Sequence, residues 1–271
     1  MSIVVAVKVP EGLVLAADSA STLEVTQGGQ TAVAMIYSNA NKLMQLKDYP
    51  VGVATWGAGN LGARTVISFV EEFENGLGPY SEVKDEVSVE GIARKLKDFL
   101  LQQFATQGLD RVPEPQQPKI GILVGGYSAG QFFSEQFVFN VPQGEFKDAR
   151  PNLSTGQPDF GANWYGATDA IVRLHFGRDE HVLDILKRLG IADDVVSRAM
   201  EIMKTEIQYP VPFNAMPLRD AIAYTDYVVS VVIGRFRFVI GAPLCGGPVD
   251  IAAIKKKEGF NWVKRKGIGA A

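Results

Sequence analysis

The stretch MSIVVAVKVPEGLVLAAD, residues 1–18, decides the predicted fold. Hydrophobic residues dominate 3–7 and again 13–17, and both runs are typical of short, buried strands. The sequence VPEG between them, residues 9–12, suits a type I turn, because proline fixes φ at the second position and glycine is favoured at the fourth. The stretch is therefore predicted to be a β-hairpin that opens the chain.

The register of this hairpin brings Asp18 beside the start of the chain. If Val9 faces Gly12, the pairing continues to Ile3 opposite Asp18. Ser2, one residue before Ile3, then lies at the same end of the hairpin. A slip of one residue would turn Asp18 to the other face of the sheet, so the prediction depends on the turn.

Ser2 gains interest from its position after Met1. A small second residue permits an aminopeptidase to remove the initiator methionine, which would leave Ser2 with a free α-amine. Such an amine has a pKa of about 7.7 to 8.0, and a base of that strength suits proton transfer near neutral pH. Ser2 would then carry a nucleophile and a general base in one residue. The alternative is that Ser2 is an ordinary exposed chain start.

Composition favours a globular, cytoplasmic protein. The 271 residues are 46% hydrophobic and 21% charged, with a formal net charge of −3, and we interpret 1–271 as a single domain with a sizeable core. This charge gives no footprint for nucleic acid, and the basic residues at 255–257 and 264–266 are interpreted as a solvated end. No segment has the length of a membrane span, and the N-terminus lacks the features of a signal peptide.

Cysteine and histidine are scarce, which limits the available chemistry. The single cysteine, Cys245, excludes an internal disulfide and a cysteine-based metal cluster. A Ser-His-Asp triad would have to use His175 or His181, and both lie in an amphipathic stretch where a partly buried or surface role is expected. The sequence contains no GxSxG elbow, P-loop or GxGxxG opening a helix.

Hydrophobic periodicity predicts strands, then helices, then strands and helices again. Strands are expected at 32–37, 43–46, 51–56, 119–127, 131–141, 163–165 and 249–254. Helices are expected at 62–74, 87–103, 168–176, 179–189, 193–207 and 218–236, with Ser88 as an N-cap. Loops are expected at 19–30, 109–118 and 142–161. This order predicts an α/β (α+β) protein with two packed sheets and helices on both outer faces.

Four features together resemble the proteasome β-subunit family and its bacterial relatives, the two-ring ATP-dependent protease and the Anbu-type ancestral β-subunits. They are the hairpin with Asp18, the step Asn41-Lys42-Leu43, the turn Gly57-Ala58-Gly59 before a helix, and the closing sequence GGPVDI at 246–251. The resemblance covers most of the chain, and residues 1–75 match best. These proteins are N-terminal nucleophile hydrolases, so the resemblance implies a four-layer αββα sandwich.

Carried over to this sequence, the resemblance implies a catalytic set of Ser2, Asp18, Lys42 and Gly57. The Ser2 hydroxyl would attack a peptide carbonyl after removal of Met1, and its own amine would take the proton. The positive charge of Lys42 would stabilise the alkoxide and disfavour a second cation on the amine, while Asp18 would orient Lys42. The backbone N–H of Gly57 would stabilise the oxyanion, and its missing Cβ would let substrate approach closely.

The resemblance also implies a proteasome-like endopeptidase of the threonine type, here with serine as nucleophile. Its substrates would be peptides or unfolded proteins, hydrolysed inside a homo-oligomeric ring, and an ATPase unfoldase is a candidate partner. No cofactor, metal, nucleic acid or membrane is implied. The pocket for the residue before the scissile bond would be lined by Ser21, Ala40, Met44, Ala54 and Ala58.

Departures from the family pattern keep two alternatives open. Ser2 lacks the methyl group that restricts χ1 in the family's threonine. Ala167 and Cys245 stand where the family has supporting serines, and the family's late carboxylate is not retained around 242–245. The alternatives are a catalytically silent β-like subunit of a ring or scaffold, and an N-terminal nucleophile amidase or ligase that acts on a specific amide.

Overall fold

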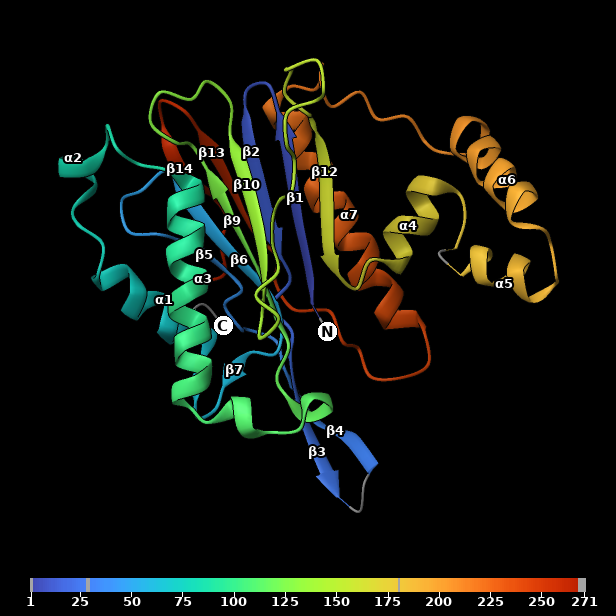
Figure 1. The fold of residues 1–271 in the computed structure, drawn as a ribbon, viewed down its shortest axis with the longest axis horizontal. Coiled ribbons are helices and arrows are strands. Elements are labelled where there is room, and N and C mark those ends of the chain that lie inside the picture. The colour runs from blue at the N-terminus through green and yellow to red at the C-terminus, as the bar shows by residue number, and fades with distance from the viewer. Residues whose placement is uncertain (1, 28–29, 180, 268–271) are drawn as a thin grey trace.

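Two five-stranded antiparallel sheets form the centre of the molecule in the computed structural model, which describes residues 2–27, 30–179 and 181–267 (Figure 1). The first sheet has the order β12 (Gly161–Gly166), β1 (Ile3–Val9), β2 (Gly12–Ala17), β13 (Asp250–Lys255), β14 (Gly259–Lys264). The second has the order β11 (Phe146–Asp148), β10 (Glu135–Val141), β9 (Ile120–Gly126), β6 (Val51–Gly57), β5 (Leu43–Gln45). The protein is therefore of the mixed α+β class.

The opening hairpin has the predicted register. Val9 pairs with Gly12, and the ladder runs to Val4 opposite Ala17. Every residue of β1 and β2 is buried. Both strands lie inside the first sheet, between β12 and β13, and both faces of that sheet are covered, which explains why the sequence is apolar almost throughout rather than alternating.

The two sheets pack face to face through one apolar layer, which we call the inter-sheet core. It contains residues from both sheets, among them Val4, Leu15, Leu123 and Ile254. A second apolar cluster lies between the second sheet and helices α1 (Val66–Asn75) and α3 (Val89–Thr106). A third lies between the first sheet and helices α4 (Asp169–Phe176) and α7 (Leu218–Phe238). Figure 1 shows these helix pairs on opposite sides of the two sheets.

Helix positions follow local signals in the sequence. Ser88 caps α3, because its hydroxyl accepts the Gly91 N–H at 3.0 Å. Helix α1 begins at Val66 rather than near 62, since Thr65 is its N-cap and 60–65 form the short hairpin of β7 (Asn60–Leu61) and β8 (Arg64–Thr65). The described part of the chain contains no helix with the length and apolar character needed to cross a membrane.

Two segments project from the body, as Figure 1 shows. One is the ribbon of β3 (Ser21–Gln27) and β4 (Gln30–Tyr37), which form a separate two-stranded sheet within the described residues. The other carries α5 (Val182–Arg188) and α6 (Asp193–Glu206), which lie beyond α4 and contribute no residue to the three apolar clusters. The remaining short elements are α2 (Tyr80–Val83) and the 3-10 turns Leu109–Arg111 and Glu114–Gln116.

Three expectations from the sequence were wrong. Residues 19–30 are not a loop, because 21–27 form β3, and a two-stranded ribbon needs only backbone pairing and no apolar alternation. Residues 142–161 contain β11. The basic end of the chain is not simply solvated: Gly259–Lys264 forms β14 on the edge of the first sheet, and the Lys266 side chain is only 9% exposed.

Candidate active site

Asp18 is the centre of the candidate site, and its side chain is fully buried. Its Oδ1 accepts the backbone N–H of Ile3 at 3.0 Å and the Lys42 ammonium at 2.7 Å. Its Oδ2 accepts the N–H groups of Ala20 at 3.2 Å and Gly246 at 3.1 Å. One carboxylate thus joins the chain start, the end of β2, the residue before β5 and a loop more than two hundred residues away.

These four donors determine what Asp18 can do chemically. An ionised carboxylate has about four lone-pair sites, and all four are used here. Asp18 therefore has no free acceptor for a substrate proton, which argues against a role as general base. Its negative charge instead holds the Lys42 ammonium in place through a charge-assisted hydrogen bond.

Lys42 connects the two sheets. Its backbone C=O accepts the Thr55 N–H at 2.8 Å, which continues the β5–β6 pairing of the second sheet, while its ammonium reaches Asp18 in the first sheet. The residue is 7% exposed. Among the described residues Asp18 is the hydrogen-bond acceptor of this ammonium, so two of its three N–H bonds are available to a nucleophile or a substrate oxygen.

Ser2 directly precedes β1 and is the neighbour of Ile3, whose N–H binds Asp18. Its C=O accepts the Ala167 N–H at 2.8 Å, and Ile3 pairs with Gly166. Gly166 has a φ of 91°, and a Cβ there would lie 1.9 Å from the Ser2 oxygen, so glycine is required for β12 to reach the chain start. Met1 lies outside the described residues, and its predicted removal stays a prediction.

Gly57 presents its N–H on the same edge of the second sheet as Lys42. Ala58 donates to Lys119 O at 2.9 Å, which makes that pair a hydrogen-bonded one, and alternation then turns the Gly57 N–H away from β9. It points instead toward the β5 side, at a level of the sheet that lies beyond Leu43, the first residue of β5. Gly57 is exposed, so this N–H can reach a bound group, as an oxyanion donor must.

The reason for glycine at this position differs from the expected one. Gly57 has a φ of 89°, and a Cβ would lie 2.3 Å from Lys119 O. The missing side chain therefore relieves a contact with the neighbouring strand and a left-handed backbone, and close approach of substrate is not needed to explain it.

The five predicted pocket residues do not share one lining. Ala54 is fully buried in the inter-sheet core, because it lies on the face of β6 that meets the first sheet. Met44 and Ala58 pack against the apolar cluster under α1 and α3. Ser21 lies near the 57–59 turn, since a Cβ on Gly59 would be 3.7 Å from its Oγ, and Ala40 donates its N–H to Ser19 O. Ala54 thus lies apart from the other four residues, and its place in a substrate pocket stays a prediction.

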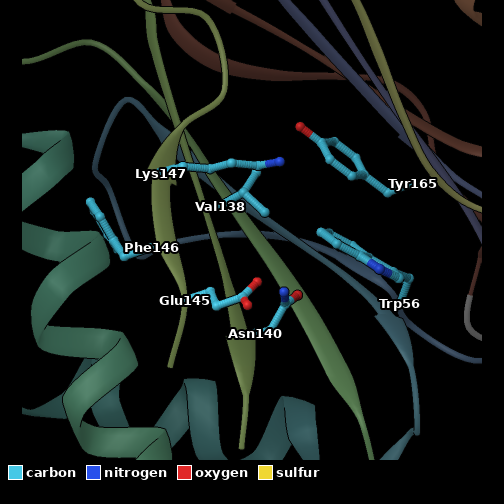
Figure 2. A pocket seen from close by; sticks show the side chains of 7 residues that line it. All are labelled: Trp56, Val138, Asn140, Glu145, Phe146, Lys147 and Tyr165. Atoms are coloured by element: carbon cyan, nitrogen blue, oxygen red, sulfur yellow. The ribbon is translucent and has the colours of Figure 1, made fainter. Parts of the chain in front are cut away.

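A pocket of about 170 Å³ lies instead between the sheets (Figure 2). The rings of Trp56 and Tyr165 stack on one side of it, with centroids 4.5 Å apart, and each residue precedes a glycine of the candidate site. Lys147, Glu145 and Asn140 project into it from the other side in Figure 2. None of the five predicted residues lines this pocket.

Gly246 belongs to the site through its contact with Asp18, and it directly follows Cys245, which stands at a supporting-serine position of the resemblance. The Gly246 N–H donates to Asp18, and Gly246 O accepts the Ser19 N–H at 3.0 Å. Burial is the main cause that raises the Cys245 pKa, to about 12, and the Asp18 charge adds to it while Lys42 opposes it. Cys245 is therefore a buried, neutral thiol whose pKa is influenced by the charges of Asp18 and Lys42.

The histidines have ordinary roles. His175 is buried on α4 with its ring 5.0 Å from that of Trp164, and burial lowers its pKa. His181 is exposed, and its Nδ1 lies 2.6 Å from Asp179 Oδ1. The hydrogen bonds of the described residues include none between a histidine and Ser2, so these contacts give no support to a Ser-His-Asp triad.

No protein-family model matches this chain, and no curated protein is significantly similar to it.

Proposed function

We propose that this chain is an N-terminal nucleophile hydrolase of the proteasome β type, and that its two sheets with helices outside them are the αββα sandwich of that class. The observation that carries the proposal is the Asp18 carboxylate, which binds the residue after Ser2 and the Lys42 ammonium with the same oxygen. A buried ion pair is expensive to maintain, and its position at the chain start is explained if Ser2 reacts there.

In the proposed reaction Ser2 acts once Met1 has been removed. The Ser2 Oγ attacks the carbonyl carbon of an amide, and the Ser2 α-amine accepts the hydroxyl proton and later gives it to the leaving amine. The Lys42 ammonium faces the developing alkoxide, and the Gly57 N–H donates to the oxyanion of the tetrahedral intermediate. Loss of the leaving amine leaves the acyl group bound to Ser2 Oγ as an ester. Water then hydrolyses this ester, with the Ser2 α-amine again acting as base.

The proposed substrates are peptides or unfolded proteins, and the proposed form is a homo-oligomeric ring. The apolar stripes of α1 and α3 are used within the subunit, where they cover the second sheet. Exposed apolar residues lie instead on the two projections, at Leu23, Val25, Met35 and Tyr37 and at Ile185, Leu189, Val195 and Ile202. These projections are the better candidates for contacts between subunits. An ATPase unfoldase and a cytoplasmic location belong to the same proposal.

A second candidate is a catalytically silent subunit. It is favoured by Ala167, which offers no hydroxyl, and by Cys245, whose buried neutral thiol is a weak hydrogen-bond donor. Neither residue can replace a supporting serine as a hydrogen-bond partner of the Ser2 amine.

Mass spectrometry of protein from its native host tests the proposal. The expected mass lacks one methionine, and treatment with a peptide β-lactone is expected to add one acyl group at Ser2 and none in Ser2→Ala. A homogeneous Met1 terminus without an adduct would leave the silent subunit as the answer. An adduct without degradation of an unfolded protein would point to a specific amidase or ligase.

A further inference from the structure

Lys266 forms a second ion pair beside the candidate site, and this pair is largely shielded from solvent. Its ammonium contacts Asp250 Oδ2 and donates to Ser19 Oγ at 2.9 Å, and its backbone N–H donates to Asp250 Oδ1 at 2.9 Å. The side chains of Lys266 and Asp250 are 9% and 3% exposed. Such burial of a lysine two residues after the last strand is unexpected for a solvated chain end.

The other partner of Lys266, Ser19, is the residue directly after Asp18. Ser19 is fully buried, its N–H donates to Gly246 O at 3.0 Å, and its C=O accepts the Ala40 N–H at 2.9 Å. Its Cβ would lie 3.3 Å from a Cβ on Gly247, so the two backbones are close. Ser19 is therefore the junction between the end of β2, the 246–247 loop and the segment that leads to Lys42.

Asp250 fixes the position of Lys266 relative to this junction. It opens β13 and pairs with Ala17, the residue before Asp18. The ammonium of Lys266 is thus anchored on one side to the strand next to Asp18 and on the other to the residue that follows Asp18. The two backbone N–H groups that bind Asp18 Oδ2 come from Ala20 and Gly246. Ala20 follows Ser19 in the sequence, and Gly246 accepts the Ser19 N–H, so both donors are direct neighbours of Ser19.

From this arrangement we propose that Lys266 is a positioning residue for the Asp18–Lys42 pair, and that the C-terminal segment completes the site by holding Ser19. The proposal rests on the proposed function only for its effect on catalysis. Lys266 touches no reacting group of the proposed mechanism: its ammonium contacts in the described residues are Asp250 and Ser19. Lys266 acts through Ser19 and the geometry of the Asp18 carboxylate.

Two variants separate this role from simple stabilisation. Ser19→Ala removes the link to Asp18 and keeps the Asp250–Lys266 ion pair. The double variant Asp250→Asn/Lys266→Met removes both charges together, so that neither is left buried alone, which Lys266→Met by itself would do. Lys264→Met is the matched control, because Lys264 lies on the same segment and pairs with Asp226 at 3.3 Å, but both side chains are exposed.

Acylation by a peptide β-lactone and amide hydrogen exchange are measured on each protein. In both test variants we expect the maximal acylation rate to fall about tenfold with an unchanged half-saturation concentration, and exchange at the Ala20 and Gly246 amides to rise at least tenfold. Lys264→Met is expected to match the wild type in both measurements.

Unchanged acylation and unchanged exchange in both variants would overturn the proposal. A rise only in the half-saturation concentration would also overturn it, because that result describes substrate contact. If the wild type is not acylated, the proposed function fails, and the exchange rates at the Ala20 and Gly246 amides still decide whether Lys266 holds the Asp18 region.

Discussion

Two lysines are buried near the β1–β2 hairpin, one toward each end, and they differ in their partners. Lys42, beside the chain start, has the Asp18 carboxylate at 2.7 Å, and that carboxylate is completed by three backbone N–H groups. Lys8, near the turn, is 3% exposed and makes no ion pair in the described part of the chain. Burial lowers the pKa of Lys8, although the charges of Asp148, Asp159 and Glu135 oppose this.

The surroundings of Lys8 also contain a buried polar group without a partner among the described residues. It lies on the same face of β1 as Val4 and Ala6, toward the inter-sheet core. Across that layer, Gln136 on β10 is fully buried, and within the described residues its amide oxygen and nitrogen have no partner. Burial alone therefore does not identify a functional lysine. The ion pair is what separates Lys42 from Lys8, because the Asp18 carboxylate holds the charge of Lys42 in a fixed place.

Removing the carboxylate from the paired end is expected to have the largest effect. Asp18→Asn leaves the Lys42 ammonium buried without an opposite charge, so we expect the free energy of unfolding to fall by about 3 to 5 kcal/mol. Urea denaturation measures it. Asp226→Asn, in an exposed pair with Lys264, is the control and is expected to change little. A loss below about 1 kcal/mol would mean that Lys42 is not held by this pair.

Removing the cation tests the chemistry of the same end. In processed protein, Lys42→Ala is expected to lower the acylation rate of Ser2 about 10²- to 10³-fold, the range seen when a donor to a developing oxyanion is lost. Lys42→Arg should rescue little, because a planar guanidinium does not fit the compact site of an ammonium. Full activity in Lys42→Ala would place the stabilising charge elsewhere.

Removing the charge of Lys8, which has no ion pair in the described residues, should change the free energy of unfolding in the opposite direction. Lys8→Met replaces a buried ammonium without an ion pair by an apolar side chain of similar length, and we expect it to raise the free energy of unfolding by about 1 kcal/mol. Lys42→Met, compared in the same urea experiment, is expected to lower it. Destabilisation by both substitutions would remove the distinction between the two ends.

The smallest expected effect is the contribution of Lys8 to the pH dependence of stability. Because the Lys8 pKa is lower in the folded protein, the unfolded chain binds more protons between that value and about 10.4, so stability rises with pH across this window. The slope from one such group cannot exceed about 1.4 kcal/mol per pH unit. We expect the difference in unfolding free energy between Lys8→Met and wild type to shrink as the pH rises, and a constant difference would contradict the shift.

Local sequence predicted the part of the site that depends on one turn. The VPEG sequence at 9–12 set the hairpin register, and the Asp18 N–H donates to Ile3 O at 3.2 Å as that register requires. The cap at Ser88 and the helical stripe of α7 were also visible, since both are read from neighbours along the chain. The position of Ala54 in the inter-sheet core was not visible, because a short apolar strand does not reveal which of its faces meets the other sheet.

The sequence by itself determined that Asp18 would lie beside the chain start, because a two-residue turn between apolar strands permits few registers. It could not determine what else would meet that carboxylate. Gly246, which binds the carboxylate, comes from the far end of the chain, and so does Lys266, which binds the neighbouring Ser19. Their approach depends on β13 pairing with β2 and on β14 forming the sheet edge. Only the tertiary structure decided those partners, since contacts between distant segments leave no periodicity in the sequence and are fixed by the packing of whole sheets.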